Sequence, residues 1–146
     1  IRPSNAFGAG QRPFVGQGFI STAMASVMRG QPIRIFGKKG TVRDYIYVSD
    51  LAAGIVSALE RGNLSETYNL GSGVGFSNID VVEAMSPLMH EIGCDICVEH
   101  LPERAFDVKA NVLDSKKLQE HTNWKPIVEL NEGLRRTCDW LRTTEG

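Results

Sequence analysis

Arg43 and Asp44 are the first adjacent side chains whose types could do chemistry. They lie in the stretch 41–55, where two tyrosines then alternate with two aliphatic residues as in a strand. A guanidinium held at the end of a regular element can clamp a phosphate with paired N–H donors. A weak Arg-Asp ion pair on the surface is the alternative, and the residue types alone leave both open.

Other residues with chemical potential lack the spacing that their chemistry needs. Cys94 and Cys97 have no second pair to complete a zinc site, and they lie at the start of a strand rather than of a helix, so Cys97 is interpreted as a packing residue. The three histidines have no ligand spacing, and no metal site is predicted. The glycines at 71–75 do not match a dinucleotide fingerprint and predict a turn from strand to helix. The turn at 37–40 is not a P-loop.

Charge is distributed unevenly along the chain. Residues 1–43 contain seven Arg and Lys and no Asp or Glu, whereas the remainder contains nine basic and 17 acidic residues. A basic third in a nearly neutral chain suggests an anionic ligand. No aromatic residues are interleaved with these cations and no nucleic-acid motif is present, so a small phosphate ester fits better than nucleic acid.

The elements that must position these residues follow from hydrophobic periodicity. The strand at 45–48 runs into a helix over 50–61 in which apolar residues recur every four positions, with Ser49 or Asp50 as its cap. A second helix begins near Ser77 with Asp80 in a capping box, and Pro87 should kink or divide it. Further helices are predicted at 18–29, 115–121 and from 130, strands at 33–36, 67–70 and 96–98, and an extended segment at 102–114.

Size and composition indicate one α/β domain over residues 1–146. Hydrophobic residues make up 42% and charged residues 23%, as in ordinary globular proteins. No apolar run reaches the roughly 18 residues that span a bilayer, so no membrane association is predicted. The odd cysteine count and the lack of a signal-peptide pattern lead us to expect a cytoplasmic protein.

Six segments in order resemble one known family. The chain is similar to the C-terminal half of the NAD-dependent nucleotide-sugar epimerases and dehydratases, which are extended short-chain dehydrogenases, and most of all to the UDP-glucose 4-epimerases among them. The segments are Arg-Pro-Ser-Asn-Ala-Phe-Gly-Ala-Gly-Gln at 2–11, Val-Arg-Asp-Tyr-Ile-Tyr-Val-Ser-Asp-Leu at 42–51, Tyr-Asn-Leu-Gly-Ser-Gly at 68–73, Arg-Ala-Phe-Asp at 104–107, Asp-Ser-Lys-Lys-Leu at 114–118, and the run from Trp-Lys-Pro at 124–126 to Leu134.

The resemblance implies a role for each matching position. Asn5 would bind the sugar nucleotide at its pyrophosphate, Arg43 and Arg104 would clamp the pyrophosphate, Phe36 would contact the uracil through its backbone, and Asp107 would hold the ribose. The cofactor-binding positions lie near the nicotinamide of NAD, and they are Pro3 and Ser4.

The resemblance also implies that part of the family pattern lies outside this sequence. No Tyr has a Lys four residues on, and the family's glycine-rich cofactor loop is absent, so no catalytic residue is assigned. We therefore expect the substrate domain of a Rossmann-type enzyme, with remnants of its parallel sheet and most of the cofactor domain missing. Its ligand would be a UDP-sugar, and we expect it to pair into a homodimer. The alternatives are a dehydratase or decarboxylase of the same family, or a non-catalytic nucleotide-sugar-binding module.

Overall fold

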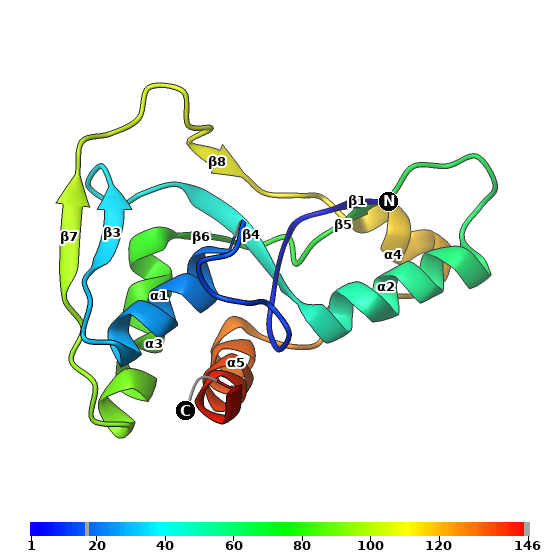
Figure 1. The fold of residues 1–146 in the computed structure, drawn as a ribbon. Helices are drawn as coiled ribbons and strands as arrows, with labels where there is room; N and C mark the ends of the chain where they lie inside the picture. Colours follow the sequence, from blue (N-terminus) through cyan, green and yellow to red (C-terminus); the bar gives the residue numbers. More distant parts are fainter. Residues whose placement is uncertain (17, 145–146) are drawn as a thin grey trace.

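The computed structural model describes residues 1–16 and 18–144, whose helices and strands gather at two ends of an elongated α/β molecule (Figure 1). In chain order the elements are β1 (Arg2–Pro3), β2 (Asn5–Phe7), α1 (Phe19–Met28), β3 (Ile33–Phe36), β4 (Val42–Tyr47), α2 (Val48–Arg61), β5 (Asn69–Leu70), β6 (Gly75–Ser77), α3 (Asn78–Glu91), β7 (Val98–Leu101), β8 (Ala110–Asn111), α4 (Lys116–Thr122) and α5 (Leu130–Thr144).

Strand β4 connects the two ends. It pairs in parallel with β2 and β8 and antiparallel with β6, with Asn5 opposite Tyr45 and Asn111 opposite Arg43. Two further parallel pairs stand apart from it, β3 with β7 at one end and β1 with β5 at the other. Figure 1 shows β4 running between these two pairs.

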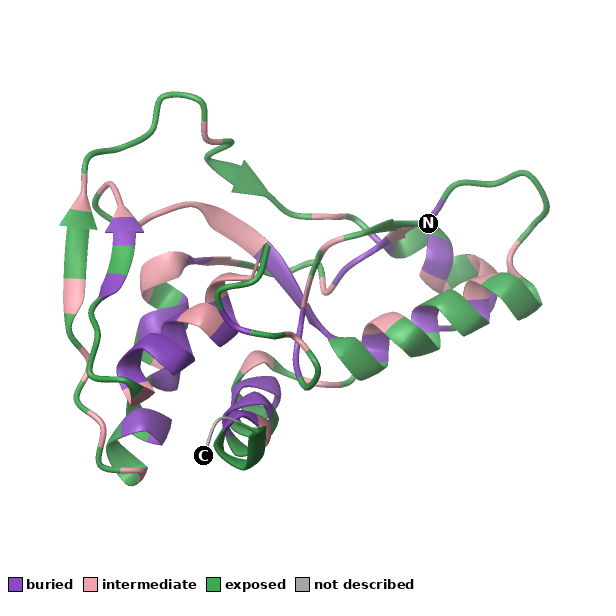
Figure 2. Cartoon of the chain, viewed as in Figure 1, coloured by how far each residue is buried: buried purple, intermediate pink, exposed green. Residues whose placement is uncertain are grey.

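The two faces of β4 serve two separate cores. Tyr45 and Tyr47 enter a large core built with α1, α3 and α5, whereas Ile46 points the other way into a small core. This confirms the alternation expected from the sequence. Buried residues are concentrated on the helices of the large core and are sparse on α2 (Figure 2). The small core consists of Ile46, Tyr68, Leu70, Leu118 and Trp124.

Helix α3 begins as its sequence predicts. Ser77 Oγ accepts from the Asp80 N–H at 3.1 Å, and the Asp80 carboxylate accepts from the Ser77 N–H at 2.7 Å, which completes the capping box. The helix then continues to Glu91 with Pro87 inside it, so the expected division at the proline does not occur. The expected helices α1, α4 and α5 are present with bounds within two residues of the prediction.

The start of helix α2 and the role of Asp50 differ from expectation. The helix begins at Val48, and neither Ser49 nor Asp50 caps it, because the N-cap is Tyr47 and no side chain accepts a hydrogen bond there. The Asp50 carboxylate instead accepts the backbone N–H groups of Ile127 and Val128 at 2.9 and 2.8 Å. Asp50 therefore ties α2 to the segment before α5.

Several smaller expectations are also corrected. The turn expected at 71–75 ends in a strand, β6, that pairs with β4. The strand expected at 96–98 is β7, which begins only at Val98. Cys97 is exposed, so its interpretation as a packing residue is wrong, and Cys94 is the member of the pair that packs on the large core.

Candidate functional site

Asp44 is completely buried and makes no ion pair with Arg43. Its carboxylate accepts four hydrogen bonds, from the N–H and hydroxyl of Ser72 at 2.8 and 2.6 Å, from the N–H of Gly73 at 3.1 Å and from the N–H of Leu113 at 3.2 Å. A Cβ at position 71 would collide with this carboxylate, which explains why the loop after β5 has glycine there. The alternative of a surface Arg-Asp pair is therefore wrong, and Asp44 fixes the loop 71–73 in place.

Arg43 points to the opposite face of β4 from Asp44, because side chains alternate along a strand. Its Nη1 donates to the carbonyls of Val42 and Val108, both at 2.8 Å. The guanidinium therefore lies against the extended segment that follows β7. Among the ion pairs of residues 1–16 and 18–144, none includes Arg43, so its remaining N–H donors are available to an anion.

A first cavity of about 360 Å³ opens where β1 passes into β2, and its lining includes Pro3, Ser4 and Asn5. Asn5 lies on the same face as Tyr45, its partner across the strands, and Arg43 is two residues before Tyr45 on that face. Ser4 Oγ is buried without a hydrogen-bond partner in the described residues. The sequence-predicted residues 3–5 therefore do meet in one cavity, with Arg43 about 7 Å along the neighbouring strand.

Tyr45 lies in the wall of this first cavity and is 7% exposed. Burial raises its pKa to about 12, and the nearby Arg43 opposes that rise only in part. The phenol is therefore protonated at neutral pH.

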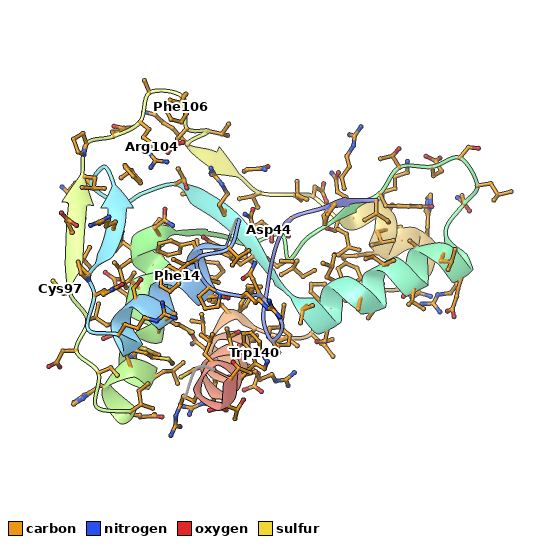
Figure 3. The ribbon with its side chains drawn as sticks, in the orientation of Figure 1. Phe14, Asp44, Cys97, Arg104, Phe106 and Trp140 are labelled. Carbon is orange, nitrogen blue, oxygen red and sulfur yellow. The ribbon has the colours of Figure 1, made fainter. Side chains whose placement is uncertain are left out.

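A second cavity of about 350 Å³ lies between the turn after β3 and the segment 103–109, and it includes Phe36, Arg104 and Asp107. The Arg104 guanidinium stacks on the Phe36 ring, with its central carbon 3.3 Å from the ring centroid. Figure 3 shows Arg104 beneath this segment, and Phe106, at the crest of the segment, is 82% exposed. The two positions expected at the nucleoside, Phe36 and Asp107, thus share one cavity with Arg104, which was expected at the pyrophosphate.

Sequence reasoning missed the other cations of the second cavity. Lys38, Lys39 and Lys109 also line it, with Glu103 as an acidic neighbour. The two lysines of the turn were visible only as part of the basic N-terminal third. The third lysine could not be identified from sequence, because nothing in the pattern of 102–114 indicates that this segment folds over the turn.

Gln11 was also missed, and it holds the first cavity in shape. Its amide donates to the carbonyl of Ala6 at 3.2 Å, and its oxygen accepts from the Ser21 hydroxyl at 2.9 Å. It therefore links the loop after β2 to helix α1. Gln11 belongs to the segment 2–11 that carries the family resemblance, which was the available signal.

A third cavity, of about 480 Å³, is larger than either of these but contains none of the predicted substrate- or cofactor-binding residues. It lies between β6, α3 and the segment 126–131, and its lining is mostly apolar, with Glu129 as the one charged residue. Its chemistry does not suit a phosphorylated ligand. Within residues 1–16 and 18–144, no cluster of His, Cys, Asp or Glu could hold a metal ion, and no helix is long and apolar enough to cross a membrane.

An elongated anionic ligand that reached both the first and the second cavity would pass Arg43, which itself lines neither of them. Arg43 stands between them, since it shares a strand face with Asn5 and bonds to Val108, next to Asp107 and Lys109. One end of such a ligand would meet the amide of Asn5, its middle would meet Arg43, and its other end would meet the cations around Phe36. This arrangement suits a diphosphate with a group at each end.

Fold and cavities together define an α/β chain of the Rossmann-type, extended short-chain dehydrogenase class. The model of the NAD-dependent epimerase/dehydratase family matches residues 1–71. A dTDP-glucose 4,6-dehydratase of Xanthomonas campestris is 29% identical over 86% of this chain and 38% of its own length. The chain belongs to the NAD-dependent epimerase/dehydratase family.

Solved structures agree with this assignment. A UDP-glucose 4-epimerase from Thermotoga maritima, determined with UDP-glucose, is 32% identical with a TM-score of 0.89 over 99% of this chain and 46% of its own. A Thermus thermophilus UDP-glucose 4-epimerase in complex with NAD is 32% identical with a TM-score of 0.85, over 98% and 46% of the two chains. The sequence therefore spans less than half the length of these relatives.

Proposed function

We propose that residues 1–146 form the substrate-binding domain of an NAD-dependent nucleotide-sugar 4-epimerase of the UDP-glucose/UDP-galactose type. The observation that carries the proposal is the position of Arg43, between the cavity of Asn5 and the cavity of Phe36, Arg104 and Asp107. In this role Arg43 and Arg104 bind the pyrophosphate, Asn5 binds beside it, Asp107 accepts from the ribose hydroxyls, and the backbone of Phe36 contacts the base.

Arg104 would have to leave the Phe36 ring to reach a pyrophosphate. In the structure its guanidinium covers that ring, and none of the ion pairs within residues 1–16 and 18–144 includes it. A cation–π contact at an exposed site contributes about 0.5–1 kcal/mol, which a charge-assisted bond to phosphate exceeds. The Phe36 ring therefore holds the Arg104 guanidinium near the site and competes only weakly with a ligand for it.

The residues of the first cavity fit the nicotinamide end of NAD. Ser4 Oγ is a buried donor without a partner, and it lies beside Pro3 and Asn5 in a cavity that opens to the surface. A carboxamide oxygen could accept from this hydroxyl. When bound, NAD would accept a hydride from the sugar and return it, and the Tyr-x-x-x-Lys pair and most NAD contacts would come from the complementary portion of the family's chain. This domain contributes binding energy at the nucleotide end, which orients the sugar for that chemistry.

A dehydratase acting on a dTDP-sugar is the second candidate, because the dehydratase relative matches this chain nearly as well as the epimerases do. A decarboxylase of the same family or a non-catalytic binding module would use the same two cavities. Calorimetry that compares the binding of UDP-, dTDP- and GDP-glucose to the chain separates the UDP-sugar proposal from the dTDP-sugar dehydratase.

Removing the Arg43 guanidinium tests the proposal. Arg43→Ala should weaken UDP-glucose binding by more than about 1.5 kcal/mol, roughly tenfold or more, because a charge-assisted donor is lost. Arg34→Ala is the matched control. Neither arginine lines either of the two cavities, but Arg34 pairs with Glu99 on β7, whereas Arg43 bonds to the Val108 carbonyl beside the second cavity. Equal affinity of the Arg43→Ala and Arg34→Ala variants, with unchanged thermal unfolding, would reject the role of Arg43.

A further inference from the structure

The second cavity carries more positive charge than the ligand of the proposed function requires. Its charged side chains come from the turn after β3 and from the segment 103–109, and they are Lys38, Lys39, Glu103, Arg104, Asp107 and Lys109. Lys109 Nζ lies 3.3 Å from the Glu103 carboxylate, so these two charges neutralise each other. Among the other four charged side chains of the cavity, only Asp107 is acidic.

Lys38 and Lys39 have no partner in that ligand. In the proposed function, on which this inference rests, Arg43 and Arg104 meet the diphosphate and Asp107 accepts from the ribose hydroxyls. Both lysines are exposed, and none of the ion pairs within residues 1–16 and 18–144 includes either of them. A neutral base and a neutral ribose offer no charge to balance theirs, so two ammonium groups are left over at the nucleoside end.

The turn that carries these two lysines is held in place from both sides. At its start the N–H of Gly37 donates to the carbonyl of Leu101 on β7 at 2.8 Å. Toward its end the carbonyl of Lys39 accepts from the N–H of Ile79, in the first turn of α3, at 3.3 Å. The backbone of Lys38 and Lys39 is therefore fixed beside the cavity before a ligand arrives, which lowers the entropic cost of using their ammonium groups.

We propose that the second cavity binds a nucleotide whose ribose carries a further phosphoryl group, in addition to the diphosphate at Arg43. The base contact at Phe36 and the ribose contact at Asp107 would place the nucleoside in the cavity that the lysines line. A phosphoryl group on one ribose hydroxyl can then reach Lys38 and Lys39, while the other hydroxyl still donates to Asp107. A phosphate monoester fits two ammonium groups better than a carboxylate does, because it carries about −1.5 to −2 charges at pH 7 and three acceptor oxygens.

Long-range attraction is the main alternative role of the two lysines. Exposed cations raise the association rate of any anionic ligand, and this effect depends on the net charge of the ligand rather than on where that charge lies. Two nucleotide isomers of the same charge distinguish the two roles, because a phosphoryl contact inside a cavity depends on the position of the group, whereas long-range attraction does not.

The binding of three uridine nucleotides to the 146-residue chain, measured by calorimetry, tests the proposal. The probes are uridine 5′-monophosphate, uridine 2′,5′-bisphosphate and uridine 3′,5′-bisphosphate, which differ only in the additional phosphoryl group. We expect one bisphosphate to bind roughly tenfold or more tightly than the monophosphate, and at least about threefold more tightly than its isomer, because charge-assisted hydrogen bonds are strong and directional. Lys38→Ala and Lys39→Ala should each reduce both ratios.

Lys125→Ala is the matched control, since Lys125 is exposed and lines none of the three cavities. It should leave both affinity ratios unchanged. All three substitutions should leave thermal unfolding nearly unchanged, because the lysine side chains are already exposed.

Three results would overturn the proposal. These are equal affinity of the monophosphate and both bisphosphates, equal affinity of the two isomers, and a bisphosphate preference that Lys38→Ala and Lys39→Ala leave unchanged. UDP-glucose is titrated alongside. A chain that binds UDP-glucose through Arg43 but gains nothing from the additional phosphoryl group rejects this proposal alone. Absence of UDP-glucose binding, with the isomer preference retained, rejects the proposed function alone, and absence of binding by all four nucleotides rejects both.

Discussion

The large core and the small core share strand β4, but their helices use hydrophobic patterns in opposite ways. In α5 the apolar residues Leu134, Cys138 and Leu141 recur at helical spacing and are all buried in the large core. In α2 the apolar residues Val48, Ile55 and Leu59 face solvent. The side that packs carries Asp50, Gly54 and Ser57, flanked by the partly buried Leu51 and Ala58. Amphipathic patterning therefore does not by itself identify the face of a helix that packs within the chain.

The difference extends to how each end is held together. Helices α1, α3 and α5 contact one another around the large core, whose buried residues number more than three times those of the small core. The small core depends on polar ties instead, such as Asp44 to the loop 71–73 and Arg61 to the Thr122 carbonyl at 3.0 Å. We infer that the end built on β1, β5, α2 and α4 opens more easily than the end built on the large core.

Truncating one buried leucine in each core tests this inference most directly. Leu134→Ala should lower the global free energy of unfolding by about 3 kcal/mol, because it leaves a cavity among three helices. Leu118→Ala removes an equally buried side chain from the small core. It should instead reduce hydrogen-exchange protection in α2, α4 and β5, and leave protection of α1 and α3 nearly unchanged. Equal loss of protection at both ends in both variants would show that the cores unfold as one unit.

Most of the architecture could be predicted from local pattern, but some chemistry could not. The capping box at Ser77 and the strand preceding α2 depend on neighbours in sequence, which is why they were predictable. Asp50 looked like a cap for the same local reason, but two N–H groups about 77 residues away proved stronger partners. Tertiary partners of this kind leave no local signal.

The residues of the candidate site likewise divide into those that local sequence indicates and those that depend on distant contacts. Local reasoning gave Arg43 a choice between a phosphate ligand and a surface pair, and only the family resemblance favoured the first. The burial of Asp44, which excludes the pair, depends on the loops at 72–73 and 113 and could not be derived from spacing. Lys109 joins the second cavity because segment 103–109 folds back over the turn after β3, which is likewise a long-range event.

The two buried aspartates, Asp44 and Asp50, allow a direct comparison of the hydrogen bonds that hold distant segments together. Asp44 uses both carboxylate oxygens, so Asp44→Asn places an NH₂ group against N–H donors and should cost about 2–3 kcal/mol. The N–H groups of Ile127 and Val128 both donate to Oδ2 of Asp50, and an asparagine can place its oxygen there, so Asp50→Asn should cost about 1 kcal/mol or less. Urea unfolding measures both. The account of the Asp44 network fails if the two variants are equally stable.

The smallest expected effect concerns the helix starts, which also differ between the two ends. Helix α3 has a capping box and α2 has no side-chain cap. Hydrogen bonds from Ser77 lower the pKa of Asp80 below its ordinary value. The stabilisation is therefore fully present above the unfolded-state pKa of about 3.9, and it is lost as the pH falls through the lowered native pKa.

Asp80→Ala should accordingly destabilise the protein by about 0.5 kcal/mol at pH 7, since the carboxylate is exposed and the helix dipole adds only a modest term. The difference from the unsubstituted chain should shrink steadily below pH 4. Glu83→Ala provides the control, because Glu83 is an exposed carboxylate on the same helix that takes no part in the cap. If the Asp80 difference persists undiminished at pH 2, its origin is helix propensity rather than the charged cap, and the contrast between α3 and α2 reduces to packing alone.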